Sequence, residues 1–570
     1  MDGAARERQM AKTIKAQVRD GVSSRRERRA RTSSAFIVSS QRDFEGVRAK
    51  SSTQVRFGRS TPPSSEKKSS ADKPSGEAVP VNEAGQAPPD DSSPDRENET
   101  LFKPASTLAA LHSIGDIWET DSIMIYLDYV FPFLFPFYRP PLVGTSRAWL
   151  LPFISQNATV YSSVLSLSAY FFTIALKDVF PEERYVCKSV MWAQAVKQAD
   201  KCFETIRKDL METTASELRT TLFNKARIMQ SIIHLLMFEL FIGNSNNWIS
   251  HLTPALAIFE DVVEQYSQFS PEKLGLECVL EQLPGPPSSY PGVLRPLWNP
   301  NQSAFRFFTA ALLYIDIVAS TSLERAPVLR SYQSRLLADL APDQVATSLD
   351  LSSFVGCENW VLIAVGDISA LDAAKKEMES AGRAFLPELL ERASRIFKTL
   401  ETGIAKLRAD QLHISNRDNI SGSKFDPLQP YFHANLHLTG KRLSAAPTRI
   451  WAHAARIYLS VVVSGWIPSD AQIRQDVAQI LSLLRHVDSA AQMHTFAWPV
   501  CVAGCLAQGD AEQEEFVAII TETGNPQLLS ALHESRRIME AVWMMRGPRD
   551  GETWDIATCL RVMGSPALLV

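Results

Sequence analysis

The sequence predicts an all-α protein, in which a large irregular multi-helix array follows a disordered basic N-terminal arm and a linker. Between residues 101 and 570, apolar side chains recur at steps of three and four, which is the spacing of one helix face. No convincing run shows the polar-apolar alternation of a half-buried β-strand. Residues 1–100 have a low apolar content instead, which is typical of a chain that does not fold alone.

The basic arm comprises residues 1–57. Residues 1–60 hold twelve Arg and three Lys against six Asp or Glu, a net charge of +9, whereas the whole chain carries −4. This asymmetry indicates a polyanionic partner for the arm. Five arginines fall within seven residues, and we expect this cluster to act in nuclear import or to contact DNA phosphates; the alternative is a solvated tail that only aids solubility. The cluster consists of Arg25, Arg26, Arg28, Arg29 and Arg31.

Residues 58–100 are rich in Ser, Pro, Asp and Glu and contain almost no aromatic or β-branched side chains. Such a segment cannot bury enough apolar surface to offset the entropy that ordering would cost. We therefore expect a flexible linker at 58–100 and a helical body at 101–570.

Within the body, the clearest apolar stripe runs from Leu218 to Leu240, and Gly243 then supplies a stop. We interpret the Pro-rich stretch 281–300 and the polar stretch 415–430 as long surface loops within one array. Further helices are predicted at about 158–178, 181–212, 248–268, 303–321, 360–380, 385–409, 448–464, 470–487, 494–507 and 526–546.

The uncharged stretch 153–176 approaches the length of a membrane span, but many Ser, Thr, Asn and Gln side chains interrupt it. A helix buried in protein is the better interpretation, and no membrane partner is expected.

The seven cysteines are an odd number without a C-x-x-C pair, and the polar, Arg-rich first thirty residues are unlike a secretory signal. We expect reduced thiols in the cytosol or nucleus.

Two pairs of residues have helical spacing that could serve a metal. His433 and His437 lie four apart, but a zinc site needs a third ligand, and the Glu of H-E-x-x-H is absent. Cys501 and Cys505 are also four apart, among small apolar residues that favour packing.

Signatures of phosphate-binding loops, dinucleotide sites, hydrolase elbows and kinases are missing from the sequence. We predict no metal, no cofactor and no enzymatic activity.

Seven segments of the body resemble the fungal-specific transcription factor domain, in the second of its two common forms. They follow one another in consistent order over roughly 440 residues. Core packing accounts for their aromatic side chains, so we expect structural anchors at Trp149, Trp248, Trp360, Trp451 and Trp498. The segments are 123–138, 147–154, 236–252, 357–377, 449–469, 496–507 and 534–546.

The resemblance implies a nuclear transcription regulator of a fungal specialised-metabolite or nutrient-use gene set. Such proteins usually begin with a DNA-binding zinc cluster of six cysteines, but here the first cysteine is Cys187, so the resemblance does not supply that module. Residues 12–29 are similar to the short basic start of relatives that lack it. DNA, through the arm, and other transcription regulators are the expected partners. The alternative function is a co-regulator or scaffold that binds no DNA and acts through the helical body.

Overall fold

The structure, a computed structural model, describes residues that all belong to one unit of the chain, Thr100–Val570. These residues form helices and contain no β-strand, which confirms the all-α prediction. The arm, the linker and the stretch 415–430 lie outside them. The described residues are 117–140, 147–179, 205, 208, 221–243, 247–267, 275–283, 285, 298–337, 348–382, 387–414, 440–487, 489–546 and 554–570.

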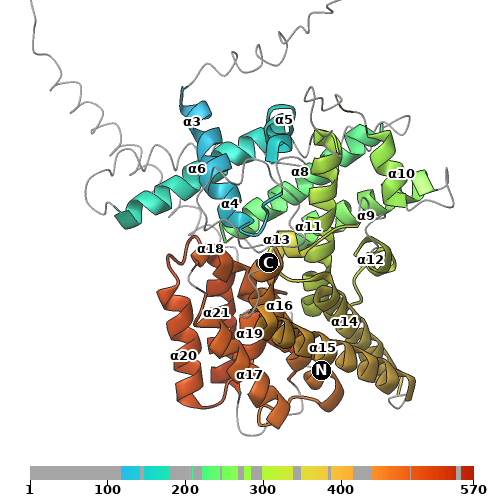
Figure 1. Cartoon of the computed structure of the whole chain (residues 1–570), viewed down its shortest axis with the longest axis vertical. Helices are drawn as coiled ribbons and strands as arrows, with labels where there is room; N and C mark the ends of the chain where they lie inside the picture. The colour runs from blue at the N-terminus through green and yellow to red at the C-terminus, as the bar shows by residue number, and fades with distance from the viewer. Residues whose placement is uncertain are drawn as a thin grey trace, which may run out of the picture. The chain divides into compact units, whose positions relative to one another are not determined.

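Figure 1 shows the helices coloured along the chain, from blue to red. The first group is α3 (Ile117–Ile125), the π-helical η1 (Tyr126–Val130), α4 (Phe131–Leu134), η2 (Arg147–Trp149), α5 (Leu150–Ser155), α6 (Ala158–Val179), α8 (Leu222–Phe241), α9 (Trp248–Ser267), α10 (Gly275–Gln282) and α11 (Pro300–Leu323). The second group is α12 (Arg330–Leu336), α13 (Ser352–Val355), α14 (Asn359–Ser380), α15 (Pro387–Ile414), α16 (Gly440–Ser464), α17 (Ala471–Leu484), α18 (Ala490–Met493), η6 (His494–Phe496), α19 (Ala497–Cys505), α20 (Gly509–Glu522), α21 (Ser530–Met545) and α22 (Ile556–Arg561).

The helix α11 lies at the centre of the described body. Its start is set by sequence: Asn299 accepts a hydrogen bond from the Gln302 backbone at 2.9 Å, and the Gln302 side chain accepts one from the Asn299 backbone at 2.8 Å. Pro300 occupies the first helical position, where no backbone donor is needed. From there α11 packs against α5, α8, α9, α14 and α22. It therefore joins helices from both groups.

Aromatic side chains fill much of the core around α11. Phe307 of α11 packs against Phe135 and Trp149, with ring centroids 4.9 and 5.1 Å apart. Further along the chain, Trp451 stacks on Trp498 at 5.2 Å. The Trp498 indole donates a hydrogen bond to Thr321 Oγ1 at 3.0 Å, which ties α19 to the end of α11.

Four of the five tryptophans expected as structural anchors are almost completely buried, which confirms that expectation for Trp149, Trp248, Trp451 and Trp498. Trp360 is only partly buried, and its ring lies against Gly403 of α15. A Cβ atom at position 403 would come within 2.3 Å of the indole, so the close approach requires glycine there.

Most of the predicted helices have observed counterparts with ends that differ by a few residues. The run predicted at 494–507 is wrong as one helix, because the 3₁₀ segment η6 precedes α19. The sequence interpretation missed α10, α20 and several short helices. The helix predicted at 181–212 lies outside the described residues, apart from the single residues 205 and 208.

Two helices of the described body are long and apolar enough to cross a membrane by length and composition, Ala158–Ala175 within α6 and Pro300–Leu323. Of these stretches, 61% and 94% of the residues are buried inside the protein. A helix that is apolar all round is also what the centre of a large helical core contains. The burial of Ala158–Ala175 agrees with the prediction of a buried helix at 153–176, although α6 begins only at Ala158.

Candidate functional site

The site residues predicted from sequence, Arg25, Arg26, Arg28, Arg29 and Arg31, lie outside the described residues. The pair His433 and His437 does as well. In the part of the chain that the structure describes, no group of three or more His, Cys, Asp or Glu side chains could hold a metal ion.

Cys501 and Cys505 are placed by the structure on consecutive turns of α19. Both side chains are buried, and their Sγ atoms are 4.0 Å apart. Burial and the contact with Cys505 raise the pKa of Cys501 well above its ordinary value. A protonated, buried thiol is a poor nucleophile, so the packing interpretation remains the better one for Cys501.

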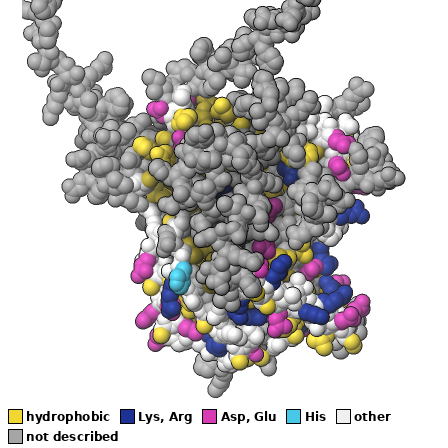
Figure 2. All heavy atoms as spheres, viewed as in Figure 1, with side chains coloured by type: hydrophobic (Ala, Val, Ile, Leu, Met, Phe, Trp, Pro, Cys, Tyr) yellow, Lys and Arg dark blue, Asp and Glu magenta, His cyan; other side chains and the backbone are white. Residues whose placement is uncertain are grey.

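The surface of the body carries charges of both signs. Figure 2 shows Lys and Arg side chains interspersed with Asp and Glu side chains over the lower part of the face in view. A phosphate-binding face would instead gather Lys and Arg in one continuous area. The described side chains on this face therefore offer no substitute for the basic arm.

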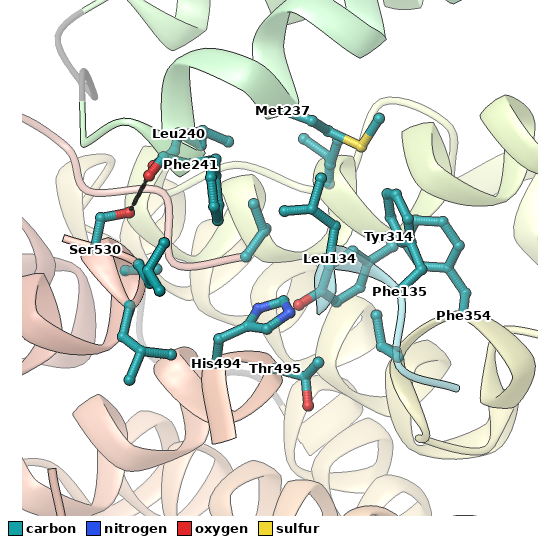
Figure 3. A pocket seen from close by; sticks show the side chains of 16 residues that line it. Leu134, Phe135, Met237, Leu240, Phe241, Tyr314, Phe354, His494, Thr495 and Ser530 are labelled. Carbon is teal, nitrogen blue, oxygen red and sulfur yellow. Dashed lines mark hydrogen bonds between the residues drawn. The ribbon is translucent and has the colours of Figure 1, made fainter. Parts of the chain in front are cut away.

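A pocket of about 80 Å³ lies where the two groups of helices meet, and we call it the junction pocket. Its walls come from α4, α8, α11, α13, η6 and the start of α21, and Val570 also lines it. Figure 3 shows side chains from these elements facing the same space. The residues that line the junction pocket include Leu134, Met237, Tyr314, Phe354, His494 and Ser530.

Local structure explains why α21 begins beside α8. Gly243 follows the end of α8 with a φ of 77°, a left-handed conformation that glycine adopts without strain. Ser530 then donates its hydroxyl to the carbonyl oxygens of Leu240 and Phe241, at 2.8 and 3.1 Å (Figure 3). The Leu240 oxygen also accepts from the Gly243 backbone N–H, at 3.1 Å, whereas the Phe241 oxygen is one of the carbonyls that a helix end leaves without a partner inside the helix. The Ser530 bonds fix one wall of the junction pocket.

His494 forms a second, polar part of the wall. Its Nε2 atom lies 3.0 Å from the carbonyl oxygen of Phe133, and its ring stacks on the Phe133 ring with centroids 5.6 Å apart. Because a carbonyl only accepts, Nε2 carries the proton and donates it. Burial lowers the pKa of His494 to about 4, although the backbone oxygens of Phe133 and Leu134 act in the opposite direction. The ring is therefore neutral at pH 7.

Tyr314 of α11 contributes the phenol of the junction pocket. Its side chain is only 3% exposed. Burial raises the pKa of Tyr314 well above its ordinary value, with a smaller contribution from Cys357. The hydroxyl is therefore a neutral donor and acceptor that faces the same space as His494 (Figure 3).

A buried His453, Asp476 and Arg456 cluster connects α16 to α17. Asp476 accepts from His453 Nδ1 at 2.7 Å and from Arg456 Nε at 2.9 Å. Burial lowers the pKa of His453, against the opposite effect of the Asp476 carboxylate. The cluster has the elements of an acid-base site, but both His453 and Asp476 are inaccessible at 0% exposure. Its effect is to pair a buried charge and hold the two helices in register.

The sequence offered no signal for the junction pocket. Tyr314 and His494 are 180 positions apart in the sequence (494 − 314). The residues three and four positions before and after each of them are all apolar. That spacing predicts burial and says nothing of which buried faces leave a space between them. Only the packing of α8, α11 and α21 reveals it.

Comparison with known proteins finds matches over most of the chain. The model of the fungal specific transcription factor domain matches residues 122–569. Transcription factor dibT of Pestalotiopsis microspora is 35% identical over 100% of this chain and 93% of its own. Pestheic acid cluster transcriptional regulator 3 of Pestalotiopsis fici is 24% identical, over 80% of this chain and 77% of its own.

A third relative is the trichothecene biosynthesis transcription regulator TRI10 of Trichoderma arundinaceum, which is 24% identical over 79% of this chain and 98% of its own. No solved structure matches the chain.

Proposed function

We propose that this chain, which belongs to the fungal specific transcription factor domain family and is a transcription regulator, acts in the nucleus and contacts DNA through its basic arm. The observation that carries the proposal is the match of the family over residues 122–569, together with a relative similar over the whole chain. The genes it regulates would be those of one specialised-metabolite cluster.

The names of two relatives support this choice of target. One is a regulator of the pestheic acid cluster, and another a regulator of trichothecene biosynthesis. Both similarities extend over more than three quarters of this chain. The relatives are transcription factors and regulators, so the proposal includes no catalytic step.

The division of labour follows from charge. Residues 1–60 carry +9, and the remainder of the chain is acidic, since the whole chain carries −4. An arm of this charge gains DNA affinity by releasing counterions from phosphates, an effect that salt weakens. The body then provides the surface for partner regulators.

The test replaces Arg25, Arg26, Arg28, Arg29 and Arg31 together by Ala in the full chain. Nuclear accumulation should fall, and DNA affinity measured by retardation at low salt should fall with it. The slope of log affinity against log salt should become shallower by about 0.9 for each phosphate that the arm no longer neutralises. Thermal unfolding of the body should hardly change, because the substitutions lie in a segment we expect to be solvated.

A matched control removes the same number of arginines from other parts of the first sixty residues. If the cluster binds the phosphates, this control variant keeps most of the nuclear accumulation and the salt slope. Should both variants behave as the unmodified chain does, the cluster is a solubilising tail and the arm assignment fails. Full-length protein that retards no DNA at low salt would favour the co-regulator function. The control substitutions are Arg6, Arg8, Arg42, Arg48 and Arg56 to Ala.

A further inference from the structure

We propose that Cys505 and Cys559 form a redox-sensitive pair, which a hydroperoxide converts into a disulfide between α19 and α22. The proposal goes beyond the function argued above, because it concerns thiols of the helical body and does not depend on whether the arm contacts DNA. It rests on the grouping of three buried thiols, the positive charge beside one of them and the way in which α22 is held.

Three of the five cysteines that the structure describes lie together. Cys501 and Cys505 belong to α19, with Sγ atoms 4.0 Å apart. The Cys505 thiol also contacts the thiol of Cys559 on α22. Each of the three is only 1% exposed. The group therefore places a second thiol beside any member that becomes oxidised.

Helix geometry selects the pair that can form a bond. Side chains four residues apart on one helix have Cβ atoms about 5–6 Å apart, whereas a disulfide needs about 3.5–4.5 Å. A bond between Cys501 and Cys505 would therefore distort α19. Cys559 belongs to a separate helix of six residues, which can move toward α19 as a unit. Cys505 with Cys559 is the pairing that leaves both helices intact.

Cys505 is the thiol that reacts first. The Arg546 guanidinium lies beside the end of α19, where it donates to the Ala507 carbonyl oxygen at 2.9 Å. Burial acts to raise the pKa of Cys505, but hydrogen bonds from the two neighbouring thiols and the charge of Arg546 together outweigh burial and lower it. The thiolate is the nucleophilic form of cysteine. Burial and the contact with Cys505 raise the pKa of Cys559, which therefore stays protonated.

The oxidation balances with a hydroperoxide as the two-electron oxidant. The Cys505 thiolate attacks one oxygen of hydrogen peroxide, so that an S–O bond forms, the O–O bond breaks and hydroxide leaves. The Cys559 sulfur then attacks the resulting sulfenic sulfur and forms the S–S bond. The Cys559 proton leaves with the displaced hydroxyl group as water. The two sulfurs together lose two electrons, and the peroxide gains them.

Access to the two buried thiols depends on α22. The helix is held by ion pairs at both ends, since Asp555 lies 2.6 Å from Lys376 Nζ and Arg561 pairs with Glu324. These four side chains are between 28% and 35% exposed, so their attraction is partly screened by solvent and salt. Opening of α22 would admit a peroxide, and its closing would bring the oxidised sulfur back to the free thiol.

The experiment treats the reduced full chain with an equimolar amount of hydrogen peroxide and blocks the remaining thiols with N-ethylmaleimide. Peptide mass spectrometry should find the peptide of Cys505 linked to the peptide of Cys559, with the loss of two hydrogen atoms. Dithiothreitol should reverse the link. While the link is present, a protease should cleave beside α22 more slowly than in the reduced chain, because the bond ties the helix to α19.

Alanine variants identify the pair. Cys505→Ala and Cys559→Ala should each abolish the link. Cys501→Ala should retain it but form it more slowly, because the Cys505 thiolate loses one hydrogen-bond donor. The matched control Cys278→Ala removes a buried cysteine of α10 and should form the link at the unmodified rate. Circular dichroism checks that each variant is folded.

Lys376→Met tests the part played by α22. The substitution removes the cation that Asp555 meets, so α22 should open more often and the link should form at least about fivefold faster. Lys225→Met, which removes the partner of the exposed Asp261, should leave the rate unchanged. Alkylation of Cys278 reports opening elsewhere in the body and should not become faster in Lys376→Met.

Several outcomes would overturn the proposal. An oxidised chain without the link, or with the link only in urea, would show that the native thiols serve packing alone. A link to Cys559 that persists in Cys505→Ala would assign the chemistry to Cys501. An equal rate for Lys376→Met and Lys225→Met would contradict the opening of α22 as the route of access. None of these results bears on the arm experiment.

Discussion

His234 shows how a single ionisable residue is accommodated in the core. Its Nδ1 lies 2.8 Å from Ser163 Oγ and its Nε2 lies 3.1 Å from Tyr126 Oη. A neutral imidazole has one donor and one acceptor, and each hydroxyl can supply the opposite role, so the ring is fully paired without a charge. Burial lowers the pKa of His234 to about 4. The ring thereby joins η1, α6 and α8 as a neutral group.

The first prediction concerns pH and His234. The unfolded chain takes up a proton here near pH 6.5, whereas the folded chain does so near pH 4. Unfolding therefore binds a proton between these values, and the free energy of unfolding falls as pH falls through that window. This one group should lower the free energy of unfolding by about 3 kcal/mol across the full window.

A His234→Gln variant checks this by urea unfolding at a series of pH values. At pH 7.5 its free energy of unfolding should be about 1–3 kcal/mol lower than that of the unmodified chain, because glutamine does not reproduce both hydrogen bonds of His234 to Ser163 and Tyr126. Below pH 6 the difference in free energy of unfolding between the two proteins should become smaller, because the unmodified chain loses stability as pH falls and the variant, whose glutamine takes up no proton, does not lose this contribution. A gap that stays constant down to pH 4 would mean that His234 is not held neutral.

At the scale of elements, the crossing of α19 and α21 depends on the absence of one side chain. A Cβ atom at Gly504 would lie 1.9 Å from Sδ and 3.1 Å from Cγ of Met539. The Trp543 indole also donates to the Gly504 carbonyl oxygen at 2.8 Å, which holds the two helices at this close distance. Glycine is unfavourable inside a helix, so its presence here reflects packing between helices.

The second prediction is that Gly504→Ala lowers the free energy of unfolding by about 1–3 kcal/mol, despite the better helix propensity of alanine. Chemical unfolding of Gly504→Ala, Met539→Ala and the double variant would measure it. Because Met539→Ala makes room for the added methyl group, the double variant should lose less stability than the sum of the single variants. Strict additivity would show that the two side chains do not compete for space.

At the scale of the whole molecule, an ion network connects the C-terminal α22 to the central helices. Lys376 Nζ of α14 lies 2.7 Å from Glu324 at the end of α11 and 2.6 Å from Asp555 at the start of α22. It also lies 3.3 Å from Asp372. Arg561 of α22 makes a further ion pair with Glu324. Three helices far apart in the sequence are thus tied through one ammonium group.

The third prediction is that Lys376→Met lowers the free energy of unfolding of the body by about 1–3 kcal/mol. This loss is smaller than the loss expected when one partner of a fully buried ion pair is removed, because the Lys376 side chain is 29% exposed. The substitution leaves the carboxylates of Glu324, Asp372 and Asp555 facing one another with less compensation. Urea unfolding measures the loss, and limited proteolysis should cleave earlier near α22.

Lys225→Met is the matched control, since Lys225 pairs with the exposed Asp261 and should cost less than about 1 kcal/mol. A Lys376→Met variant that loses no more than this control would show that the network contributes nothing to holding α22.

Much of the fold follows from local pattern. The apolar stripes that end near Leu240 and Leu323 predict α8 and α11 within a few residues, because helical periodicity belongs to the segment itself. The helix α20 was missed because its first half, GDAEQEE, is charged and leaves few apolar residues to show a period. The candidate arm cluster is likewise a local feature of charge, and it remains a prediction.

The sequence by itself determined the helical class of the body, the place of the charged arm and the family of transcription regulators to which the chain belongs. Tertiary structure alone decided that Tyr314, His494 and Ser530 share the walls of one pocket. It also decided that Lys376 meets Asp555. The physical reason is that periodicity reports which face of a helix is buried, whereas the partner of that face depends on how helices distant in sequence pack together.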